Sequence, residues 1–435
     1  MPIKGDQFNY LGDSMGTEKN EETMLGSYRV LDLSDDKGFY CGQLLGSLGA
    51  DVIKVEIPGG DLTRNIGPFL HDVPDMDKSL YWMGYNTNKR GITLDIETSD
   101  GKKIFEKLVS SADVVIDTFE PGYLKKIGFD YDSLVQINPK IVLTSITHFG
   151  QSGPYSGLKA SDLVCWGMSG MLFVTGDPDR YPVRVSHIPL TYLLASMDGA
   201  LATAIALHWR ATSAKGQHID VSVQDSANKT AWMIHERWAV TGEEFPRGSS
   251  FYSVPNSDVK LRLVWPAKDG HIFYMIYTGA FGAAEDGRLV KWLDEEGMAD
   301  DYLKGIAWST LEWRKQTSEE ANRIHDYFAR FFATKTKSEL LEEALKRRIM
   351  LQPVSSARDL VEHPHLTARD YWQDVAYPQL DMTLRYPVRF CLNSETPCKN
   401  WRSAPFIGEH NSEIYGDELG YSTSEIISLK EAGII

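Results

Sequence analysis

Short β-branched segments alternate with helix-like segments along the first third of the chain, and this alternation constrains the fold more than any other feature. YRVLDL begins at Tyr28, helical spacing follows at 39–50, and VIKVE ends at Glu56. The order repeats with GITLDI, a helix expected at 99–110, DVVIDTF and IVLTSITHF. This pattern predicts a parallel α/β sheet, whose ligands bind outside the carboxyl ends of the strands. The loops to inspect follow Leu33, Glu56, Phe119 and Phe149.

The composition changes in the middle of the chain. Residues 243–256 are rich in Gly, Ser and Pro, and LRLVWPAKDGHIFYMIY then predicts a hairpin that turns at Asp269 and Gly270. Helical segments at 282–348 complete a second, smaller α+β domain. Beyond Gln352, DVAYPQL and MTLRYPVRF predict further strands, and a last helix is expected at 424–432.

The charge of the chain excludes a broad class of partners. The 435 residues include 45 Lys plus Arg and 60 Asp plus Glu, which gives a net charge of −15. A general nucleic-acid binder needs a basic face, so we expect no nucleic-acid partner. A small anionic ligand would have to be met by a local group of Lys and Arg.

The cysteines and the apolar segments predict a cytoplasmic protein. Cys41, Cys165, Cys391 and Cys398 are too few and too scattered for a disulfide framework, and they contain no CxxC pair for zinc. The amino terminus is polar and reads as a surface arm at 1–27, without the apolar core of a secretory signal. The most apolar helical stretch, 201–209, is shorter than the 20 or so residues that cross a bilayer, so no membrane anchor is expected.

Several common active-site motifs are missing. The first strand-to-helix turn reads SDDKGFYCG, which lacks the glycines of a dinucleotide site, although Glu56 ends the second strand where a ribose-binding acid would lie. The chain contains neither a GxxxxGK[ST] loop nor a GxSxG nucleophile elbow. His363 and His365 lack a carboxylate or thiol set, so a helix start at Pro364 is favoured over a metal site, and no metal is predicted.

Basic side chains occur in the loops between elements of the sheet. Arg64 follows PGGDLT, Lys89 lies in NTNKR, and Lys126 follows the turn at Pro121 and Gly122. Each alone is best interpreted as a solvated surface charge. Together they could surround a polyanion, with Arg suited to bidentate phosphate contacts. Phe119 could supply a flat surface for a base, although an aromatic side chain at such a position is more often part of a core.

Asp162 is the most suggestive acid in the chain. It lies between the Gly- and Pro-rich segment QSGPYSGLKAS and the apolar run LVCWGMSGML. An Asp at this position would usually be the N-cap of a helix. A helix N-terminus also stabilises the anion that a carboxylate nucleophile requires, so the cap and the nucleophile are compatible interpretations.

From Tyr28 to Ile435 the chain resembles the family III CoA-transferases, also called the CaiB/BaiF family. The signal rests on many stretches in the same order across nearly the whole chain. These stretches are RVLDL, LLGSLGADVIKVE, GGDLTR, NTNKRGITLDI, SADVVIDTFEPG, INPKIVLTSITHFGQSGPY, SDLVCWGMSGML, TGDPDRYPVR, GQHIDVSVQDS and PFIGEHN.

The resemblance implies a covalent transfer of CoA from an acyl-CoA donor to a carboxylic acid acceptor. Asp162 matches the family nucleophile, which forms an acyl-aspartyl anhydride and then an aspartyl-CoA thioester. CoA and acyl-CoA would be substrates, with no tightly bound cofactor and no metal. The positions that match CoA contacts in the family are Lys37, Arg64, Lys89, Thr118, Phe119, Lys126 and Ile127; Lys37 and Thr118 differ from the usual side chains.

The resemblance also implies an architecture. The family fold is an interlocked, ring-like homodimer in which a Rossmann-like large domain is built from both termini. The expected boundaries are an arm at 1–27, the first part of the CoA-binding large domain at 28–225, a small domain at 226–330, and a linker and return to the large domain at 331–435.

Two alternatives remain open within the family. One is an acyl-CoA racemase, which would deprotonate the carbon beside the thioester with a His next to the Asp and a second acid, or an isomerase that transfers CoA within one molecule. Here Ser161 replaces that His, and Leu190, Thr191 and Tyr192 occupy the segment of the second acid, which argues against racemisation. The chain could also be the partner subunit of a heteromeric CoA-transferase.

Overall fold

The computed structural model of the chain describes residues 22–435 apart from 249, 255, 278 and 388. Most of the arm predicted at 1–27 therefore lies outside the described residues. The chain forms two compact units. One contains residues 1–33, 42–115 and 373–435, and the other contains residues 34–41 and 116–372.

A six-stranded sheet supports the predicted α/β fold. Its strands are β1 (Arg29–Asp32), β2 (Asp51–Glu56), β3 (Lys89–Thr93), β4 (Val114–Asp117), β5 (Val142–Thr147) and β6 (Gln217–Ser222). They lie in the order β3-β2-β1-β4-β5-β6, and β1 with β2, β2 with β3, and β5 with β6 pair in parallel. Every residue of β3, β4 and β5 is buried, as expected for strands that are covered on both faces. The order reverses between β1 and β4, so the switch point lies there.

The helices of the sheet region follow the predicted alternation. They are α1 (Phe39–Ser47), α2 (Leu80–Tyr85), α3 (Ser99–Ser110), α4 (Tyr123–Ile127), α5 (Tyr131–Ile137), α6 (Asp162–Met168), α7 (Met171–Val174), α8 (Leu190–Ser213), α9 (Val223–Asn228) and α10 (Trp232–Thr241). α3 confirms the helix predicted at 99–110. It begins there because the Thr98 hydroxyl accepts a hydrogen bond from the Gly101 N–H at 3.1 Å.

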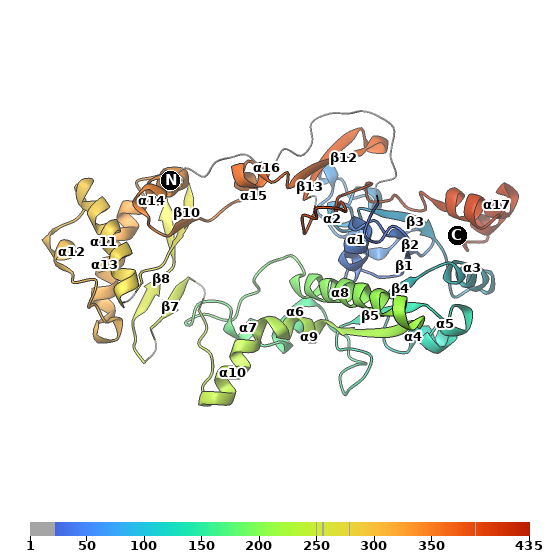
Figure 1. Cartoon of the computed structure of the whole chain (residues 1–435), viewed down its shortest axis with the longest axis horizontal. Coiled ribbons are helices and arrows are strands. Elements are labelled where there is room, and N and C mark those ends of the chain that lie inside the picture. The colour runs from blue at the N-terminus through green and yellow to red at the C-terminus, as the bar shows by residue number, and fades with distance from the viewer. Residues whose placement is uncertain (1–21, 249, 255, 278, 388) are drawn as a thin grey trace. The chain divides into compact units, whose positions relative to one another are not determined.

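Segments from both ends of the chain pack together in the first unit. β12 (Trp372–Tyr377) and β13 (Met382–Pro387) form the ribbon predicted beyond Gln352, and the last helix is α17 (Thr423–Glu431). In Figure 1, α17 lies beside α3, and the Lys107 ammonium is 3.0 Å from the Tyr421 hydroxyl. The Ile434 carbonyl accepts a hydrogen bond from the Asp95 N–H at 2.8 Å. Long-range contacts therefore hold the C-terminal segment against the early strands.

The long helix of the second unit is α8, which packs against β5 and β6 (Figure 1). At 24 residues it is long and apolar enough to cross a membrane by length and composition, which corrects the expectation that this apolar stretch was too short. Half of its most apolar window is buried inside the protein, and core helices pass the same test. Its buried residues include Ala195, Gly199 and Ala206, whose small side chains allow close approach to the sheet.

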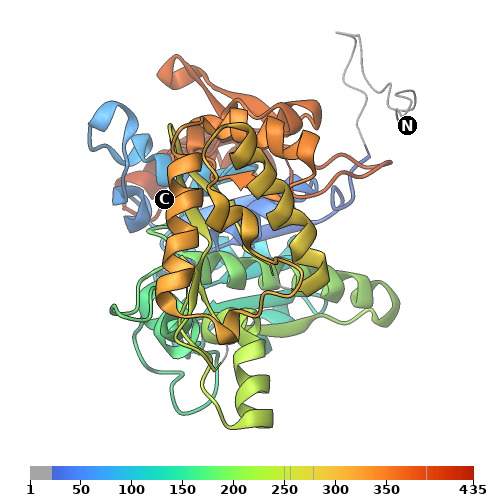
Figure 2. The same ribbon diagram turned by 90° about the vertical axis from the view of Figure 1, so that its left-hand side faces the viewer.

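A separate hydrophobic cluster lies within residues 254–351. The strands in this part of the chain are β7 (Phe251–Ser253), β8 (Lys260–Arg262), β9 (Val264–Ala267), β10 (Gly270–Tyr274) and β11 (Leu351–Pro353). Its helices are α11 (Gly279–Glu295), α12 (Asp301–Gly305), α13 (Ser318–Phe332) and α14 (Lys337–Arg347). Figures 1 and 2 show α11 and α13, coloured yellow to orange, side by side, with the Trp292 and Phe331 rings 4.8 Å apart.

The hairpin predicted at Asp269 and Gly270 is confirmed, because β9 and β10 pair antiparallel across that turn. The cluster continues through Leu340 and Leu351, beyond residue 330. The domain boundaries predicted at 226 and 330 stay predictions.

Two short helices follow this cluster, α15 (Ala357–Val361) and α16 (Pro364–Ala368). The His363 ring accepts a hydrogen bond from the His365 N–H at 3.2 Å and caps α16. The predicted helix start at Pro364 is therefore confirmed. Across the described part of the chain, no group of three or more His, Cys, Asp or Glu side chains could hold a metal ion.

Candidate active site

Asp162 begins α6, and its side chain is 7% exposed. Ser161 precedes it in extended conformation and makes no side-chain cap, so Asp162 is the first helical residue and not the N-cap. Its carboxylate turns instead to a segment 22 to 29 residues further along the chain. The capping interpretation of Asp162 is therefore wrong, and the carboxylate is held by tertiary contacts.

The two carboxylate oxygens of Asp162 have different partners. Oδ1 accepts hydrogen bonds from the Thr191 N–H at 3.0 Å and the Thr191 hydroxyl at 2.7 Å. Oδ2 accepts one hydrogen bond from Arg184 Nη2 at 2.7 Å. Thr191 lies in the first turn of α8, where backbone N–H groups have no partner within the helix. The positive end of a 24-residue helix therefore stabilises the Asp162 anion together with Arg184.

Three titratable side chains near this carboxylate, those of Cys165, His148 and Tyr192, are neutral near pH 7. Burial and the charge of Asp162 raise the pKa of Cys165 to about 12, so this residue stays a thiol. Burial and the nearby Lys37 ammonium lower the pKa of His148 to about 4. Burial also raises the pKa of Tyr192, whose hydroxyl lies 3.0 Å from His148 Nε2. Apart from its contact with the Arg184 cation, Asp162 thus lies among side chains that do not exchange protons near pH 7.

Lys37 and Thr118 follow β1 and β4 in the chain, and both contact Asp35. The Thr118 hydroxyl accepts a hydrogen bond from the Asp35 N–H at 2.8 Å, and the Lys37 ammonium pairs with the Asp35 carboxylate. The Ser196 hydroxyl of α8 donates to the Lys37 carbonyl at 2.8 Å. The helix that holds Asp162 therefore also holds the loop of Lys37. The structure brings these predicted residues together, while their contact with CoA stays a prediction.

Phe119, Lys126 and Ile127 lie just beyond β4. The Phe119 ring packs on Tyr123 with centroids 4.5 Å apart, Ile127 is 7% exposed, and Lys126 is exposed on α4. The role of all three residues in CoA binding stays a prediction.

A row of polar side chains crosses the neighbouring strands. The Ser145 hydroxyl lies 2.5 Å from Asp117 Oδ2 and 2.9 Å from His218 Nε2, and all three residues line a hollow of about 190 Å³. Burial raises the pKa of Asp117 to about 7. Asp117 Oδ1 also accepts the Phe119 N–H at 3.2 Å, which positions the loop after β4.

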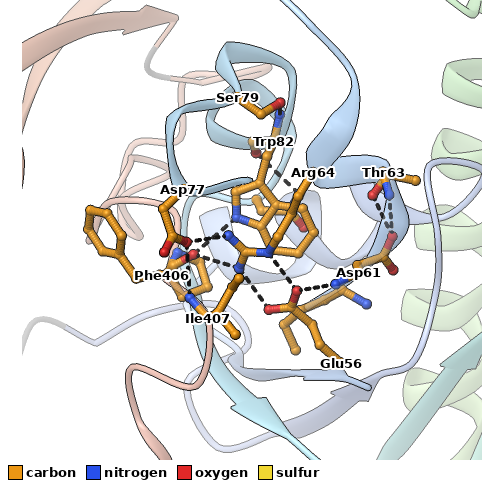
Figure 3. Close-up of polar contacts among 12 residues, drawn as sticks. Glu56, Asp61, Thr63, Arg64, Asp77, Ser79, Trp82, Phe406 and Ile407 are labelled. Carbon is orange, nitrogen blue, oxygen red and sulfur yellow. Dashed lines mark hydrogen bonds and ion pairs between the residues drawn. The ribbon is translucent and has the colours of Figure 1, made fainter. Parts of the chain in front are cut away.

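Arg64 is fully buried in an internal network (Figure 3). Its guanidinium binds both oxygens of Glu56, at 2.6 and 2.7 Å, and Asp77 Oδ1 at 2.9 Å. It also donates to the Pro405 carbonyl at 3.0 Å and stacks on Trp82, 3.7 Å from the ring centroid. Glu56 therefore serves as the partner of Arg64. The predicted contact of Arg64 with CoA stays untested, but its side chain has no exposed surface in this structure.

Lys89 is buried in a similar way. Its ammonium lies 2.7 Å from Asp32 Oδ2 and 2.8 Å from Asn86 Oδ1, and neither charged side chain is exposed. Gly42 makes room for this pair, because a Cβ atom there would lie 2.4 Å from Asp32 Oδ2. Lys89 thus neutralises an internal carboxylate at the start of β3, and its predicted contact with CoA stays a prediction.

Sequence reasoning missed Arg184, His148 and Asp117, and it treated Thr191 only as a replacement for an acid. The one signal for Thr191 was its place in the segment where racemases carry that acid. The contacts of the other three arise from pairing across strands or between distant segments, so no local motif marks them.

The fold and the site together define an α/β protein with a buried, hydrogen-bonded carboxylate at the start of a helix. The chain belongs to CoA-transferase family III, whose family model matches residues 25–411. It is therefore an enzyme of the CoA-transferase class, which acts on CoA thioesters.

Curated relatives cover almost the whole chain. The chain is 32% identical to the succinyl-CoA:(R)-benzylsuccinate CoA-transferase subunit BbsE of Thauera aromatica, over 94% of this chain and 97% of the relative. It is 30% identical to a succinate–glutarate CoA-transferase of Agrobacterium fabrum, over 92% and 96% of the two chains. A formyl-CoA:oxalate CoA-transferase of Streptomyces avermitilis is also 30% identical, over 94% and 99%.

A solved structure also matches. The crystal structure of a CaiB/BaiF family protein from Brucella suis has a TM-score of 0.74 and 30% identity, and the match covers 91% of this chain and 100% of that one.

Proposed function

We propose that the protein transfers CoA from an acyl-CoA donor to a free carboxylic acid through covalent intermediates on Asp162. The observation that carries the proposal is the buried Asp162 carboxylate, whose Oδ1 accepts two hydrogen bonds from Thr191 at the start of α8. Two donors hold Oδ1, whereas Oδ2 accepts a single hydrogen bond from Arg184, so Oδ2 is the oxygen assigned to the attack.

The chemistry begins with attack by Asp162 Oδ2 on the thioester carbon. A carbon–oxygen bond forms, the carbon–sulfur bond breaks, and CoA leaves as the thiolate with an acyl-aspartyl anhydride behind it. The thiolate then attacks Cγ of Asp162, and the donor acid leaves as a carboxylate that carries Oδ2 with it. An aspartyl-CoA thioester remains.

The second half repeats these steps in reverse. The acceptor carboxylate attacks Cγ and displaces CoA, and the thiolate attacks the acceptor carbon of the new anhydride. The new acyl-CoA leaves, and the Asp162 carboxylate is restored. Thioesters and anhydrides have similar acyl-transfer reactivity, so the proposed route requires no resident cofactor.

Thr191 has a specific role in this scheme. Each attack on Cγ places negative charge on Oδ1, the oxygen that the Thr191 N–H and hydroxyl contact at 3.0 and 2.7 Å. Donors at this distance from a developing oxyanion lower the barrier without reorganisation. Thr191 therefore stabilises the tetrahedral states at Asp162.

The test is replacement of the nucleophile. Asp162→Asn should lower kcat for CoA exchange by at least about 10³-fold, because the amide cannot form the anhydride. With succinyl-CoA followed by hydroxylamine, mass spectrometry should find a hydroxamate on the Asp162 peptide of the natural chain only. Asp198→Asn, which alters a partly exposed carboxylate paired with Lys229, is the matched control. Full activity in Asp162→Asn would rule out the covalent route.

A second candidate is a catalytic subunit that needs a different partner chain. The name of the Thauera aromatica relative, which contains the word subunit, favours it. In that case the purified chain would be labelled at Asp162 but would turn over only after a second polypeptide is added. Turnover by the purified chain alone would exclude this candidate.

Racemisation has less support. Oδ1 and Oδ2 of Asp162 contact Thr191 and Arg184, and neither is a carboxylic acid or a histidine that could deprotonate a second face. We also propose that the protein works in the cytoplasm, supported by its four free thiols.

A further inference from the structure

Arg184 is the cation that contacts the proposed nucleophile, and it lies on a segment without helix or strand. It belongs to the irregular stretch 175–189 between α7 and α8, and its side chain is 34% exposed. It binds Asp162 through Nη2 alone; among the described residues its guanidinium has no second hydrogen-bond acceptor. This contact therefore does not use the fork of donors that makes Arg a strong carboxylate ligand.

The contact opposes the first chemical step. Oδ2 must direct a lone pair at the thioester carbon, yet that oxygen accepts a hydrogen bond from Arg184 at 2.7 Å. Thr191 occupies Oδ1 with two donors, so Oδ1 is no better placed to attack. An ionised carboxylate oxygen keeps a second lone pair, so the contact does not prevent attack, but withdrawal of Arg184 from Oδ2 makes that oxygen a stronger nucleophile.

Formation of the anhydride changes the charges around Arg184. When the anhydride forms, the negative charge of Asp162 passes to the CoA thiolate, and Arg184 loses its partner. The neighbouring Lys37 ammonium already has one in Asp35. An acyl group that carries its own carboxylate would supply the missing charge at the place where Arg184 is released.

We propose that Arg184 is a specificity-determining residue that binds the free carboxylate of a dicarboxylic acyl group, and that its transfer from Asp162 to the substrate exposes Oδ2 for attack. This inference rests on the proposed nucleophilic role of Asp162. A bidentate contact with the substrate replaces the single hydrogen bond to Asp162, so the exchange is favourable. An acyl group without a carboxylate leaves Arg184 on Oδ2 and the nucleophile weaker.

The distances fit an acyl group with a short carbon chain. The thioester carbon must approach Oδ2 to about 3–3.5 Å for attack. In a succinyl group the free carboxylate lies a few bonds further, within reach of a guanidinium that starts 2.7 Å from the same oxygen. The substrate class is therefore the CoA thioesters of short dicarboxylic acids.

The experiment compares two thioesters of equal chain length, succinyl-CoA and butyryl-CoA. The rate of Asp162 labelling is measured in single turnover with hydroxylamine trapping, and kcat/KM is measured with a common acceptor acid. The natural chain should favour succinyl-CoA by about 100-fold or more, since loss of a charged hydrogen-bonding partner is discriminated strongly. Arg184→Gln should lower the rate with succinyl-CoA by about 100-fold and leave the rate with butyryl-CoA unchanged or higher.

Two further variants complete the comparison. Arg184→Lys should retain an intermediate preference for succinyl-CoA, because a point charge replaces the fork. Arg180→Gln, which removes an exposed charge from the same segment, should leave the ratio of the two thioesters unchanged. Unfolding temperatures of all variants should agree with that of the natural chain, since Arg184 lies on an exposed, irregular segment.

The outcomes separate the two proposals. Equal losses with both thioesters in Arg184→Gln would overturn the role of Arg184 in specificity and leave the nucleophile in place. Failure of both thioesters to label Asp162 in the natural chain would overturn the proposed function, and the role of Arg184 with it.

Discussion

The two carboxylate oxygens of Asp162 accept hydrogen bonds from two different kinds of residue, a threonine and an arginine. Thr191 contacts Oδ1 from the rigid start of α8, while Arg184 contacts Oδ2 from an irregular segment. In the proposed mechanism the first contact stabilises an oxyanion that forms repeatedly, and the second is released before attack. This asymmetry follows from the elements that carry the two side chains.

At this scale Thr191→Val is the informative change. It keeps the backbone N–H but removes the hydroxyl donor 2.7 Å from Oδ1. A hydrogen bond to a charged group contributes about 1.5–3 kcal/mol, so formation of the aspartyl-CoA thioester should slow by about 10- to 100-fold. Rapid quench followed by intact-protein mass spectrometry measures that step.

Thr203→Val is the control for this variant. Thr203 lies on the same helix, and its hydroxyl meets the Thr144 hydroxyl at 2.7 Å in a buried pair. Its loss alters α8 without removing a donor to Asp162, so the rate should be unchanged. Equal rates in the natural chain and Thr191→Val would show that the hydroxyl does not stabilise the oxyanion.

At the scale of helices and strands, an ion pair rather than an apolar core holds the loop after β2. Arg64 joins the end of β2 to the Pro405 carbonyl, and Asp77 joins Arg64 to the Ile407 N–H, as Figure 3 shows. The network thereby ties the C-terminal segment to an early strand of the same unit. This is a structural role for residues that the sequence marked as ligand contacts.

Glu56→Gln tests that role. It removes the buried charged partner of the Arg64 guanidinium and leaves only the partly exposed Asp77, which costs about 3–5 kcal/mol of unfolding free energy. The urea midpoint should fall accordingly, at constant pH and salt. Asp77→Asn should cost less, because the Asp77 side chain is 33% exposed and water can replace its contact. A similar loss in both variants would show that burial does not decide the importance of the pair.

The sequence pattern predicted which segments form helices, and capping residues decide where those helices begin. Residues 223–241 divide into α9, a 3-10 turn at Lys229–Ala231 and α10. α11 to α14 fall within the helical segments predicted at 282–348, apart from the first three residues of α11, and Thr317 and Thr336 begin α13 and α14 with capping boxes. Local propensity decides such features because the groups that satisfy the helix ends lie within a turn.

For the whole molecule, the surface of the second unit carries a further prediction. α8 and α10 expose large apolar side chains, which in a monomer would remain in contact with water. These side chains are Leu201, Ile205, Trp209, Trp232, Met233, Trp238 and Val240. A second copy of the chain, expected from the resemblance to interlocked homodimers, would cover them.

Light scattering after size-exclusion chromatography should therefore give about twice the mass of one chain. Its unfolding temperature should rise with protein concentration, because association stabilises the folded state by mass action. Trp232→Glu and Leu201→Glu should weaken the assembly, whereas a change at exposed Arg180 should not. A fully active species with the mass of one chain would contradict the predicted homodimer.

The sequence by itself determined the alternating strands and helices, the parallel sheet, the placement of Asp162 at a helix start and the family. These follow from periodicity, turn residues and local caps, whose physics acts over a few residues. Only the tertiary structure decided which charges meet. Lys89 pairs with Asp32 and Arg184 with Asp162 across 57 and 22 residues of chain, respectively, because the sheet and α8 bring them together. Burial then makes Asp32 indispensable to Lys89, since an unpaired charge in the interior is too costly to keep, whereas Arg184 is 34% exposed and can lose its partner.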